Sequence, residues 1–491
     1  MKLDELIEYL KYKDLINFKN IDITGISYNS NTTKKGDIFV CMVGEHTDGH
    51  KYAKMAIDKG AVALLVEHKV DGVTVPQVQV DSTKYKIADI ADRFYSSPSK
   101  GINLIGVTGT NGKTTVTHLI QKIMEGNHQK CALIGTLGYK LSSTSEYRNA
   151  KHTTPQAPEL QATLRMIKDI EKIDNVVMEV SSHALDQNRV GGCRFNGAVF
   201  TNLTQDHLDY HITMENYFKA KALLFQRLQE GSFAVINIDD EYGERLLSVV
   251  PEGVKKLTYG VKKQADVMAE DIDFSSNGAE FTMVTNDKEY HVSLHMNGMF
   301  SVYNVLAAVT TAIAMGISVE TSLKALQNVH GVAGRFEVVN KKPLVIVDYA
   351  HTPDGLENVL KTAREITPKN GKLICVFGCG GDRDATKRPK MGAIAQKLAD
   401  KIIITSDNPR SEDPQQIITD IIAGLKSVDP ETVTVEPDRH EAIAMLKTVA
   451  NNNDVVMVAG KGHEDYQILK DKTIHFDDRE EVRKVFAGSV I

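Results

Sequence analysis

The stretch from Ile102 to Thr115 limits the possible folds of this chain more than any other part of its sequence. It reads INLIGVTGTNGKTT, in which an apolar run leads into a glycine turn, and Lys113-Thr114-Thr115 then opens a helix with one apolar face. A strand, a glycine turn and a helix N-terminus together point backbone N–H groups and the positive end of the helix dipole at an anion. This pattern predicts a phosphate-binding loop.

The chemistry expected of this loop is nucleotide binding. Lys113 would reach the terminal phosphates, and the Thr114 hydroxyl would bind Mg²⁺. The strict spacing G-x-x-x-x-G-K-[ST] is not met, because Val107 occupies its first position. The alternative is a glycine turn that binds nothing, and the Lys-Thr pair at the helix start favours phosphate binding over it.

Length and composition indicate a globular protein of the cytosol. A chain of 491 residues should divide into roughly three domains. The net charge of −6 disfavours a nucleic acid or an anionic membrane as partner. The five cysteines are scattered without zinc-ligand spacing, the N-terminus is too charged for a signal peptide, and no apolar run is long enough to span a bilayer. We therefore expect a cytoplasmic protein without a membrane partner, and we expect a monomer.

Strand and helix patterns divide the chain into three α/β segments. Residues 1–97 read as a small α/β domain with polar loops, and a Ser-Ser-Pro-Ser sequence marks the linker after it. Residues 98–330 contain several strand–helix alternations, which imply a doubly wound parallel sheet around the phosphate loop. Residues 331–491 contain four further apolar runs, which we interpret as a Rossmann-like domain.

Glu179 ends a buried strand expected at residues 175–180. A carboxylate at the end of a strand beside a phosphate loop is where a Mg²⁺ ligand belongs. A surface glutamate at a strand end is an equally good interpretation of Glu179 taken alone.

A polar loop follows the next strand of the central segment. It contains two histidines and two aspartates, Asp206, His207, Asp209 and His211. This composition indicates either metal ligation or an ordinary polar loop. The helix expected at 217–225 contains Lys221, which nothing in the local sequence distinguishes from a surface lysine.

The four apolar runs of the C-terminal segment each end in a polar loop. The carboxyl ends of parallel strands meet at one edge of an open α/β sheet, where ligands bind. The side chains expected there are Asp348, His351, Arg383, Asp407, Asn408, Arg410, Lys461, His463 and Glu464. Any one of them could belong to a cap or a turn, but four such loops in series favour a small-molecule site. The residues alone thus predict an ATP-using ligase or kinase whose second, charged substrate binds the C-terminal domain.

Ten motifs together resemble those of the Mur ligases of bacterial peptidoglycan synthesis, of the type that adds the third residue of the peptide. In order they are TGTNGKTT, HTTP, EVSSHALDQNRV, NLTQDHLDYH, AKALLF, GRFE, DYAHTPD, GCGGDRD, DNPR and GKGHEDY. They extend from Thr108 to Tyr466, and the N-terminal segment matches more weakly, chiefly through GDIFVCMVG and DGH. The resemblance implies a uridine-nucleotide domain at 1–97, an ATP domain at 98–330 and an amino-acid domain at 331–491.

The resemblance also implies a role for each residue that matches a family motif. The implied ATP contacts are Gly109, Thr110, Asn111, Gly112, Lys113, Thr114, Thr115, Asn304, Arg335 and Asp348. The implied contacts to the UDP-MurNAc-dipeptide are Ser30, Thr153, Thr154, Ser181, Gln187 and Arg189. The implied Mg²⁺ ligands are Thr114, Glu179, His207 and Lys221, the last as a carbamate, and the implied catalytic residues are Lys113, Glu179, His207 and Lys221. At the uridine loop the chain has Asn29-Ser30-Asn31 where the family usually has Asp-Ser-Arg, so only Ser30 carries over.

The reaction implied by the resemblance is amide ligation through an acyl phosphate. The D-Glu carboxylate of UDP-MurNAc-L-Ala-D-Glu would attack the γ-phosphorus of ATP, and the amine of a diamino acid would then displace phosphate. Two loop arginines indicate that this amino acid is meso-diaminopimelate, because its extra carboxylate suits a guanidinium fork. The expected diaminopimelate site comprises Arg383, Asp407, Asn408, Pro409, Arg410, Gly460 and Glu464.

Several alternatives stay open at this point. Arg410 could cap a helix or pair with the nearby Glu412 or Asp413. The enzyme could add L-lysine instead of diaminopimelate. It could be a folylpolyglutamate synthetase, although DNPR and GCGGDRD do not suit that family, or a nucleotide-dependent switch that hydrolyses ATP without ligation.

Overall fold

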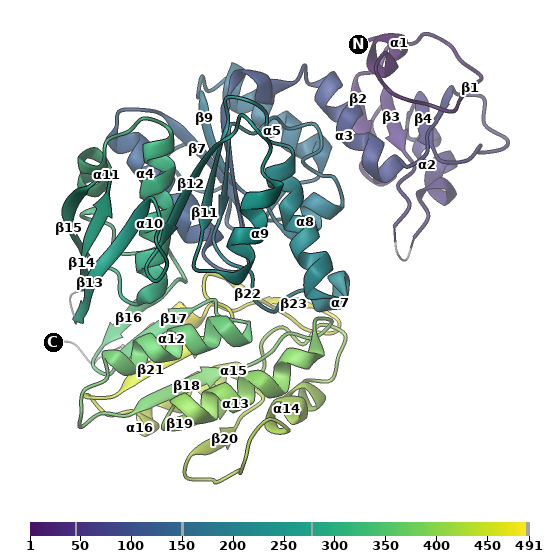
Figure 1. Ribbon diagram of the computed structural model, residues 1–491. Helices are drawn as coiled ribbons and strands as arrows, with labels where there is room; N and C mark the ends of the chain where they lie inside the picture. The colour runs from purple at the N-terminus through teal and green to yellow at the C-terminus, as the bar shows by residue number, and fades with distance from the viewer. Residues whose placement is uncertain (45–46, 149–151, 276–277, 488–491) are drawn as a thin grey trace.

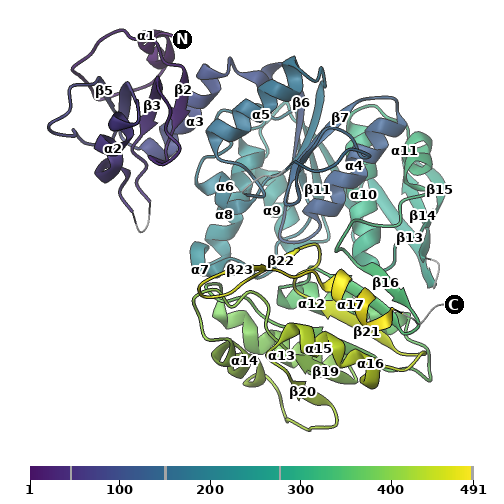
Figure 2. The ribbon, with the colours of Figure 1, turned by 180° about the vertical axis from the view of Figure 1, so that it is seen from behind.

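Three α/β units follow one another along the chain, each built around its own sheet (Figure 1, Figure 2). They are seen in a computed structural model that describes residues 1–44, 47–148, 152–275 and 278–487. Within these ranges the three sheets have five, ten and six strands, and a two-stranded ribbon belongs to the last unit. In both views the C-terminal unit lies below the central one. The N-terminal unit stands to one side, where α3 (Thr83–Phe94) packs on α5 (Ala157–Asp169).

The N-terminal sheet has the strand order β1-β5-β4-β3-β2, and only the β1–β5 pair is antiparallel among its described strands. Its strands are β1 (Asp14–Ile16), β2 (Gly25–Ser27), β3 (Asp37–Val40), β4 (Ala63–Val66) and β5 (Gln77–Gln79). Successive residues of β3 alternate between the two faces. Ile38 and Val40 pack with α1 (Leu3–Ile7) and α3, whereas Phe39 packs with α2 (Ala53–Asp58).

The central sheet has the strand order β15-β14-β13-β12-β11-β10-β6-β9-β7-β8. Its strands are β6 (Asn103–Thr108), β7 (Cys131–Gly135), β8 (Gly138–Lys140), β9 (Asn175–Glu179), β10 (Gly197–Phe200), β11 (Phe233–Asn237), β12 (Lys255–Gly260), β13 (Val267–Ser275), β14 (Gly278–Thr285) and β15 (Lys288–Leu294). Six strands that are adjacent in this order, β12, β11, β10, β6, β9 and β7, run parallel to their neighbours in the series. β6, which leads into the phosphate loop, therefore lies between two buried strands.

Helices cover both faces of the central sheet, as expected for a doubly wound fold. Ile105 and Val107 of β6 pack with α4 (Lys113–Gly126), α10 (Met299–Ala314) and α11 (Val319–Leu326). Leu104 faces the other way, toward α5, α6 (Ser182–Asp186), α8 (Met214–Gln226) and α9 (Glu241–Val249). The short α7 (Leu208–His211) precedes α8.

One part of the central sheet is not predicted by the strand–helix alternation. β13, β14 and β15 form an antiparallel extension, and β8 pairs antiparallel with β7. The turn between β14 and β15 contains Asn286 and Asp287, both with positive φ, as in the tight turns of β-hairpins. This Asn-Asp pair is the sequence signal that would have revealed the hairpin.

The C-terminal sheet has the strand order β16-β17-β21-β18-β19-β20. Its strands are β16 (Glu337–Lys341), β17 (Leu344–Asp348), β18 (Leu373–Phe377), β19 (Lys401–Ile404), β20 (Val433–Val435) and β21 (Val455–Ala459), and the ribbon is β22 (Tyr466–Ile468) with β23 (Thr473–His475). The four predicted apolar runs are β17, β18, β19 and β21, which are neighbouring parallel strands. Their carboxyl-terminal loops therefore leave the same edge of the sheet.

Helices also cover both faces of the C-terminal sheet. On one face lie α12 (Pro353–Glu365), α13 (Arg388–Leu398) and α14 (Pro414–Ile422). On the other lie α15 (Arg439–Ala444), α16 (Leu446–Val449) and α17 (Asp478–Phe486). None of the helices in the described ranges is long and apolar enough to cross a lipid bilayer.

Candidate active site

The loop predicted to bind phosphate connects β6 to α4. Gly109 and Gly112 have φ angles of +150° and +88°. A Cβ atom on Gly109 would lie 1.8 Å from Thr201 Oγ1, so a side chain is excluded there. Lys113 folds back over the loop, and its Nζ donates hydrogen bonds to the carbonyl oxygens of Gly109 (2.9 Å) and Thr110 (2.8 Å).

The ammonium of Lys113 is half-buried at the start of α4. Desolvation lowers the pKa of Lys113 on balance, although the charges of Glu179 and Asp206 oppose that shift. A cation at this place adds to the positive end of the helix dipole. The arrangement favours binding of a polyanion such as a nucleoside triphosphate.

A cavity of about 350 Å³ opens beside the phosphate loop, between the central and C-terminal units. Its volume lies within the range typical of small-molecule sites. The central unit contributes Asn111, Gly112, Thr114, Thr115 and Asn304, and the C-terminal unit contributes Arg335, Asp348 and Asp354. The three residues expected to hold the adenine, phosphate and ribose of ATP (Asn304, Arg335 and Asp348) thus share one cavity with the phosphate loop.

Arg335 and Asp348 are fixed by contacts around this cavity. Arg335 Nη2 donates a hydrogen bond to Thr114 Oγ1 (3.2 Å), and its guanidinium lies 4.5 Å from the centre of the Tyr349 ring. The carboxylate of Asp348 accepts hydrogen bonds from the backbone N–H groups of Phe336 (2.7 Å) and Ala350 (2.7 Å). Burial raises the pKa of Asp348, and Arg335 opposes that effect. Arg335 therefore reaches from the C-terminal unit to the phosphate loop.

Glu179 lies beside Thr114, as expected of two Mg²⁺ ligands. Glu179 Oε2 accepts hydrogen bonds from Thr114 Oγ1 (3.1 Å) and Thr136 Oγ1 (3.0 Å), and Oε1 accepts one from the Thr136 N–H (2.9 Å). A carboxylate and a hydroxyl at a helix N-terminus are the hard oxygen donors that Mg²⁺ prefers. The donor chemistry of this pair fits that cation.

His207 and Lys221 form a second group around Tyr217, whose ring centre lies 6.1 Å from that of His207 and 4.5 Å from Lys221 Nζ. Lys221 is buried, and its Nζ donates a hydrogen bond to the Gly109 carbonyl oxygen (2.8 Å). His207 has a positive φ of 54°, and its Nε2 lies 3.3 Å from Asp206 Oδ2. Burial lowers the pKa of His207 to about 3, against the pull of Asp206, so its ring is a neutral donor at pH 7. The predicted metal ligands therefore divide into two pairs around Gly109 and Lys113.

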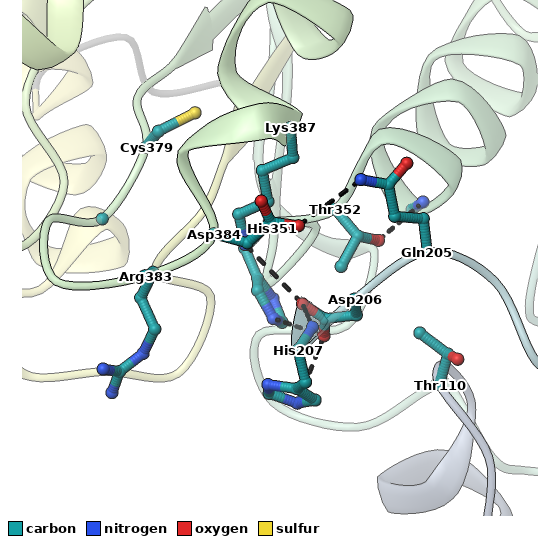
Figure 3. Close-up of polar contacts among 12 residues, drawn as sticks. Thr110, Gln205, Asp206, His207, His351, Thr352, Cys379, Arg383, Asp384 and Lys387 are labelled. Atoms are coloured by element: carbon teal, nitrogen blue, oxygen red, sulfur yellow. Dashed lines mark hydrogen bonds and ion pairs between the residues drawn. The ribbon is translucent and has the colours of Figure 1, made fainter. Parts of the chain in front are cut away.

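The loop that contains His207 also joins the central unit to the C-terminal one (Figure 3). Asp206 lies 3.8 Å from Lys387 Nζ and 3.7 Å from His351 Nε2. Gln205 Nε2 donates a hydrogen bond to Thr386 Oγ1 (3.1 Å). Burial raises the pKa of Asp206, but His207, His351 and Lys387 outweigh it and hold that pKa well below its usual range.

The residues expected to bind the dipeptide precursor cluster at the end of β9. Thr154 Oγ1 donates to the Glu179 carbonyl oxygen (2.8 Å) and accepts from the Ser181 N–H (3.1 Å). Arg189 donates to the Thr154 carbonyl oxygen (3.1 Å) and, through two nitrogens, to Gln187 Oε1 (3.1 and 2.6 Å).

The two other residues expected to bind the precursor are Thr153, which lies near this cluster, and Ser30, which lies on the N-terminal unit. Thr153 Oγ1 lies 3.2 Å from Thr136 Oγ1, whose proton goes to Glu179, so Thr153 is the donor of this pair and lies close to Glu179 as well. Ser30 belongs to the turn between β2 and β3 of the N-terminal unit, where it is buried. The two units touch near this turn, because Tyr28 donates a hydrogen bond to Glu159 of α5 (2.6 Å).

The DNPR and GKGHE loops, after β19 and β21, meet in a polar network. Asn408 Nδ2 donates to Glu464 Oε2 (2.9 Å), and Lys461 Nζ donates to that same oxygen (2.9 Å) and to Asn408 Oδ1 (3.2 Å). A Cβ atom on Gly460 would lie 2.5 Å from Asp407 Oδ2. Asp407, Asn408, Gly460 and Glu464 are therefore brought together as expected.

Arg410 and Arg383 both lie near Gly380, where a Cβ atom would be 2.9 Å from Arg410 Nη1 and 3.8 Å from Arg383 Cγ. Arg410 Nη1 donates a hydrogen bond to the Gly381 carbonyl oxygen (2.8 Å). The alternative partner Glu412 is instead paired with Arg388 (2.9 Å).

Sequence reasoning missed several residues of the site. Thr136, which follows β7, donates two hydrogen bonds to Glu179. Asp354 accepts a hydrogen bond from Asn111 Nδ2 of the phosphate loop (2.9 Å), across the two units. Asp354 lies in the DYAHTPD motif, so its position at the start of α12 was the available signal. Thr136 had no such signal, because its partner is 43 residues away.

Comparisons with known proteins agree with this geometry. Family models described as "Mur ligase family, catalytic domain", "Mur ligase middle domain" and "Mur ligase, glutamate ligase domain" match residues 22–95, 107–312 and 334–462. A protein from Syntrophomonas wolfei is 45% identical over 495 residues, and the match covers 100% of both chains. The chain belongs to the Mur ligase family.

Two relatives of this Mur ligase and one solved structure have the same printed name. The Syntrophomonas protein and one from Synechococcus elongatus, 48% identical over 478 residues and 95% of each chain, are both called UDP-N-acetylmuramoyl-L-alanyl-D-glutamate--2,6-diaminopimelate ligase. A solved structure with that name is 34% identical with a TM-score of 0.68, and the match covers 100% of this chain and 99% of the other. The predicted family and the α/β fold class are confirmed.

Proposed function

We propose that this Mur ligase adds meso-diaminopimelate to UDP-MurNAc-L-Ala-D-Glu in peptidoglycan precursor synthesis, with ATP and Mg²⁺, through an acyl phosphate. The observation that carries the proposal is the meeting of the DNPR and GKGHE loops beside Arg410, on the unit that also closes the nucleotide cavity. Relatives at 45% and 48% identity carry the name of the diaminopimelate-adding enzyme. The proposal assigns residues 1–97 to the uridine nucleotide, 98–330 to ATP and 331–491 to the amino acid, in a cytoplasmic monomer.

Phosphoryl transfer rests on charges around the phosphate loop. Lys113 would stabilise the negative charge that develops on the transferring γ-phosphoryl, and Arg335 would approach it from the C-terminal unit. Thr114 and Glu179 would hold Mg²⁺ on one side, and His207 with a carbamylated Lys221 would do so on the other. When bound, Mg²⁺ neutralises charge on the phosphate oxygens.

The D-Glu carboxylate of the dipeptide, which accepts the phosphoryl group, would lie next to the charges around the phosphate loop. At the end of β9 the Ser181 N–H donates a hydrogen bond to Thr154 Oγ1, which in turn donates one to the Glu179 carbonyl oxygen. Arg189 supplies a guanidinium at that place, where it would orient an anionic peptide. A dipeptide held there would direct its D-Glu carboxylate toward the γ-phosphate, which is the geometry that forms an acyl phosphate.

Recognition of the amino acid would depend on Arg410. Meso-diaminopimelate carries one carboxylate more than L-lysine, at its far end, and a guanidinium fork matches that group. Gly460 and Glu464 would receive the distal ammonium. L-lysine would leave Arg410 without that partner, and a site built for a polar group rejects the analogue that lacks it by a factor on the order of 10⁴.

The test is a ligation assay with meso-diaminopimelate and L-lysine as competing amino acids. We expect kcat/KM for meso-diaminopimelate to exceed that for L-lysine by a factor on the order of 10⁴, and Arg410→Ala to lose most of that preference. Arg410→Lys keeps the charge without the fork, so it should resemble Arg410→Ala in preference. Equal or better use of L-lysine by the unmutated enzyme would show that it is a lysine-adding ligase instead.

A further inference from the structure

A buried ion pair lies behind the two loops that meet at Asn408 and Glu464. It joins Arg439, the first residue of α15, to Asp478, the first residue of α17, and both side chains are 0% exposed. The pairing is bidentate, with Nε to Oδ1 at 2.7 Å and Nη2 to Oδ2 at 2.7 Å. Desolvation of two charges often costs as much as their attraction returns, so stability alone is a weak reason for such a pair.

The same guanidinium donates to two backbone carbonyls. Nη1 donates to the Ser406 oxygen (3.2 Å), and Nη2 donates to the Ala459 oxygen (3.0 Å). Ser406 directly precedes Asp407 of the DNPR loop, and Ala459 directly precedes Gly460 of the GKGHE loop. Arg439 therefore holds the first turn of both loops at once.

Sheet pairing does not link these two loops directly within the described residues. In the strand order β18 lies between β19 and β21, and the ladders of β18 with its two neighbours end at Ile404 and Ala459. Beyond those residues one backbone hydrogen bond, from the Arg410 N–H to the Ile468 carbonyl oxygen (3.1 Å), holds the DNPR loop to β22, and side-chain contacts join the two loops. Asp478 orients the guanidinium, because its two oxygens fix the plane of the fork.

The contacts between the loops depend on that separation. The Asn408–Glu464 hydrogen bond is 2.9 Å long, and Gly460 packs so closely on Asp407 that a Cβ atom would lie 2.5 Å from its Oδ2. A small displacement of either loop would change the distance between Arg410, two residues after Asn408, and Glu464. That distance has to match the spacing between the distal carboxylate and the distal ammonium of the bound amino acid.

We propose that Arg439, oriented by Asp478, is a positioning residue for the incoming amino acid. It acts through the carbonyls of Ser406 and Ala459 and sets the spacing between the DNPR and GKGHE loops. The inference rests on the proposed function, because it assumes that these loops bind the diamino acid. It adds a determinant of specificity that is remote from the substrate.

The test compares steady-state kinetics of Arg439→Lys and Asp478→Asn with those of the unmutated enzyme. A lysine replaces three donor nitrogens by one, so it cannot keep the bidentate pair with Asp478 while it reaches both carbonyls. An asparagine is neutral and has one side-chain oxygen, so it cannot accept from both nitrogens of the guanidinium fork in the bidentate way. We expect KM for meso-diaminopimelate to rise about tenfold in both variants, equivalent to about 1.4 kcal/mol. KM for ATP and for UDP-MurNAc-L-Ala-D-Glu should stay unchanged, and the preference over L-lysine should fall.

Arg364→Lys is the matched control. Arg364 also pairs with a carboxylate, Asp400 (2.9 Å), and donates to a carbonyl, Leu398 (2.8 Å), in the same unit, but on its surface. This control should leave the three KM values and the preference unchanged. If weakening any arginine–carboxylate pair of this unit changed the KM values, Arg364→Lys would change them as well.

The inference is overturned if folded variants, judged by thermal unfolding, keep the KM and preference of the unmutated enzyme. It is also overturned if all three KM values rise together, because that result indicates general loosening. If both single variants fail to fold, the apolar double variant Arg439→Met/Asp478→Leu decides by the same criteria. An unmutated enzyme that does not use meso-diaminopimelate would instead refute the proposed function.

Discussion

Lys221 is buried beside the phosphate loop, which its position in the helix sequence does not predict. Its side chain is 2% exposed, its Nζ bonds to the Gly109 carbonyl, and the Nζ lies 4.5 Å from the centre of the Tyr217 ring. Burial and the nearby ammonium of Lys113 hold the pKa of Lys221 well below its usual range. A neutral amine is the form that attacks CO₂, and the carbamate produced would be an anion beside Lys113. Both effects favour the carbamate over the free ammonium.

We expect the unmutated enzyme to lose activity in CO₂-free buffer and to regain it with bicarbonate. ¹³C-bicarbonate should give a carbamate carbon signal in the NMR spectrum, absent in Lys221→Ala. Lys221→Ala should be inactive, unresponsive to bicarbonate and partly rescued by short carboxylates. Full activity without CO₂, with no carbamate signal, would make Lys221 a structural lysine.

At the scale of elements, the turn from β6 to α4 depends on Gly109. Its φ of +150° is unfavourable for any side chain, and a Cβ atom would meet Thr201 Oγ1 at 1.8 Å and the Asn202 backbone at 3.1 Å. Gly231 has a φ of +81°, but a Cβ atom there has no described neighbour within 4 Å. A comparison of alanine substitutions at these two glycines therefore separates the effect of a clash in the phosphate loop from the effect of backbone strain alone.

We expect Gly109→Ala to weaken ATP binding about 10- to 100-fold, because a strained backbone residue costs roughly 1–3 kcal/mol and the loop has to move. Isothermal titration calorimetry measures this affinity directly. Gly231→Ala should change only the free energy of unfolding, by about 1 kcal/mol. Equal ATP affinity in all three proteins would show that the loop does not hold the phosphates.

The elements that sequence patterns predict are the ones whose signals are local. The strand–turn–helix around Gly109 and the four C-terminal strands follow from apolar runs and adjacent polar loops. Contacts such as Lys221 with Gly109, 112 residues apart, or Arg439 with Asp478, 39 residues apart, leave no mark at either position. The expected residue roles came from the family resemblance, whereas the distances among them come only from the folded chain.

The whole molecule brings sites on different units to one place. Arg335 and Asp354 of the C-terminal unit bond to Thr114 and Asn111 of the phosphate loop. The cavity between these units therefore has walls from both. Ligation requires ATP, the dipeptide and the amino acid to meet, which the proposed binding sites on the three units would allow. A switch protein would need only the nucleotide site.

The most direct test follows the oxygen atoms of the dipeptide. UDP-MurNAc-L-Ala-D-Glu labelled with oxygen-18 in its side-chain carboxylate is incubated with the enzyme, ATP, Mg²⁺ and meso-diaminopimelate, and the released phosphate is analysed by mass spectrometry. The account predicts that one labelled oxygen passes to each phosphate, and that ADP forms only slowly when the dipeptide is left out. Unlabelled phosphate, or ADP formed at the same rate without the dipeptide, would contradict it.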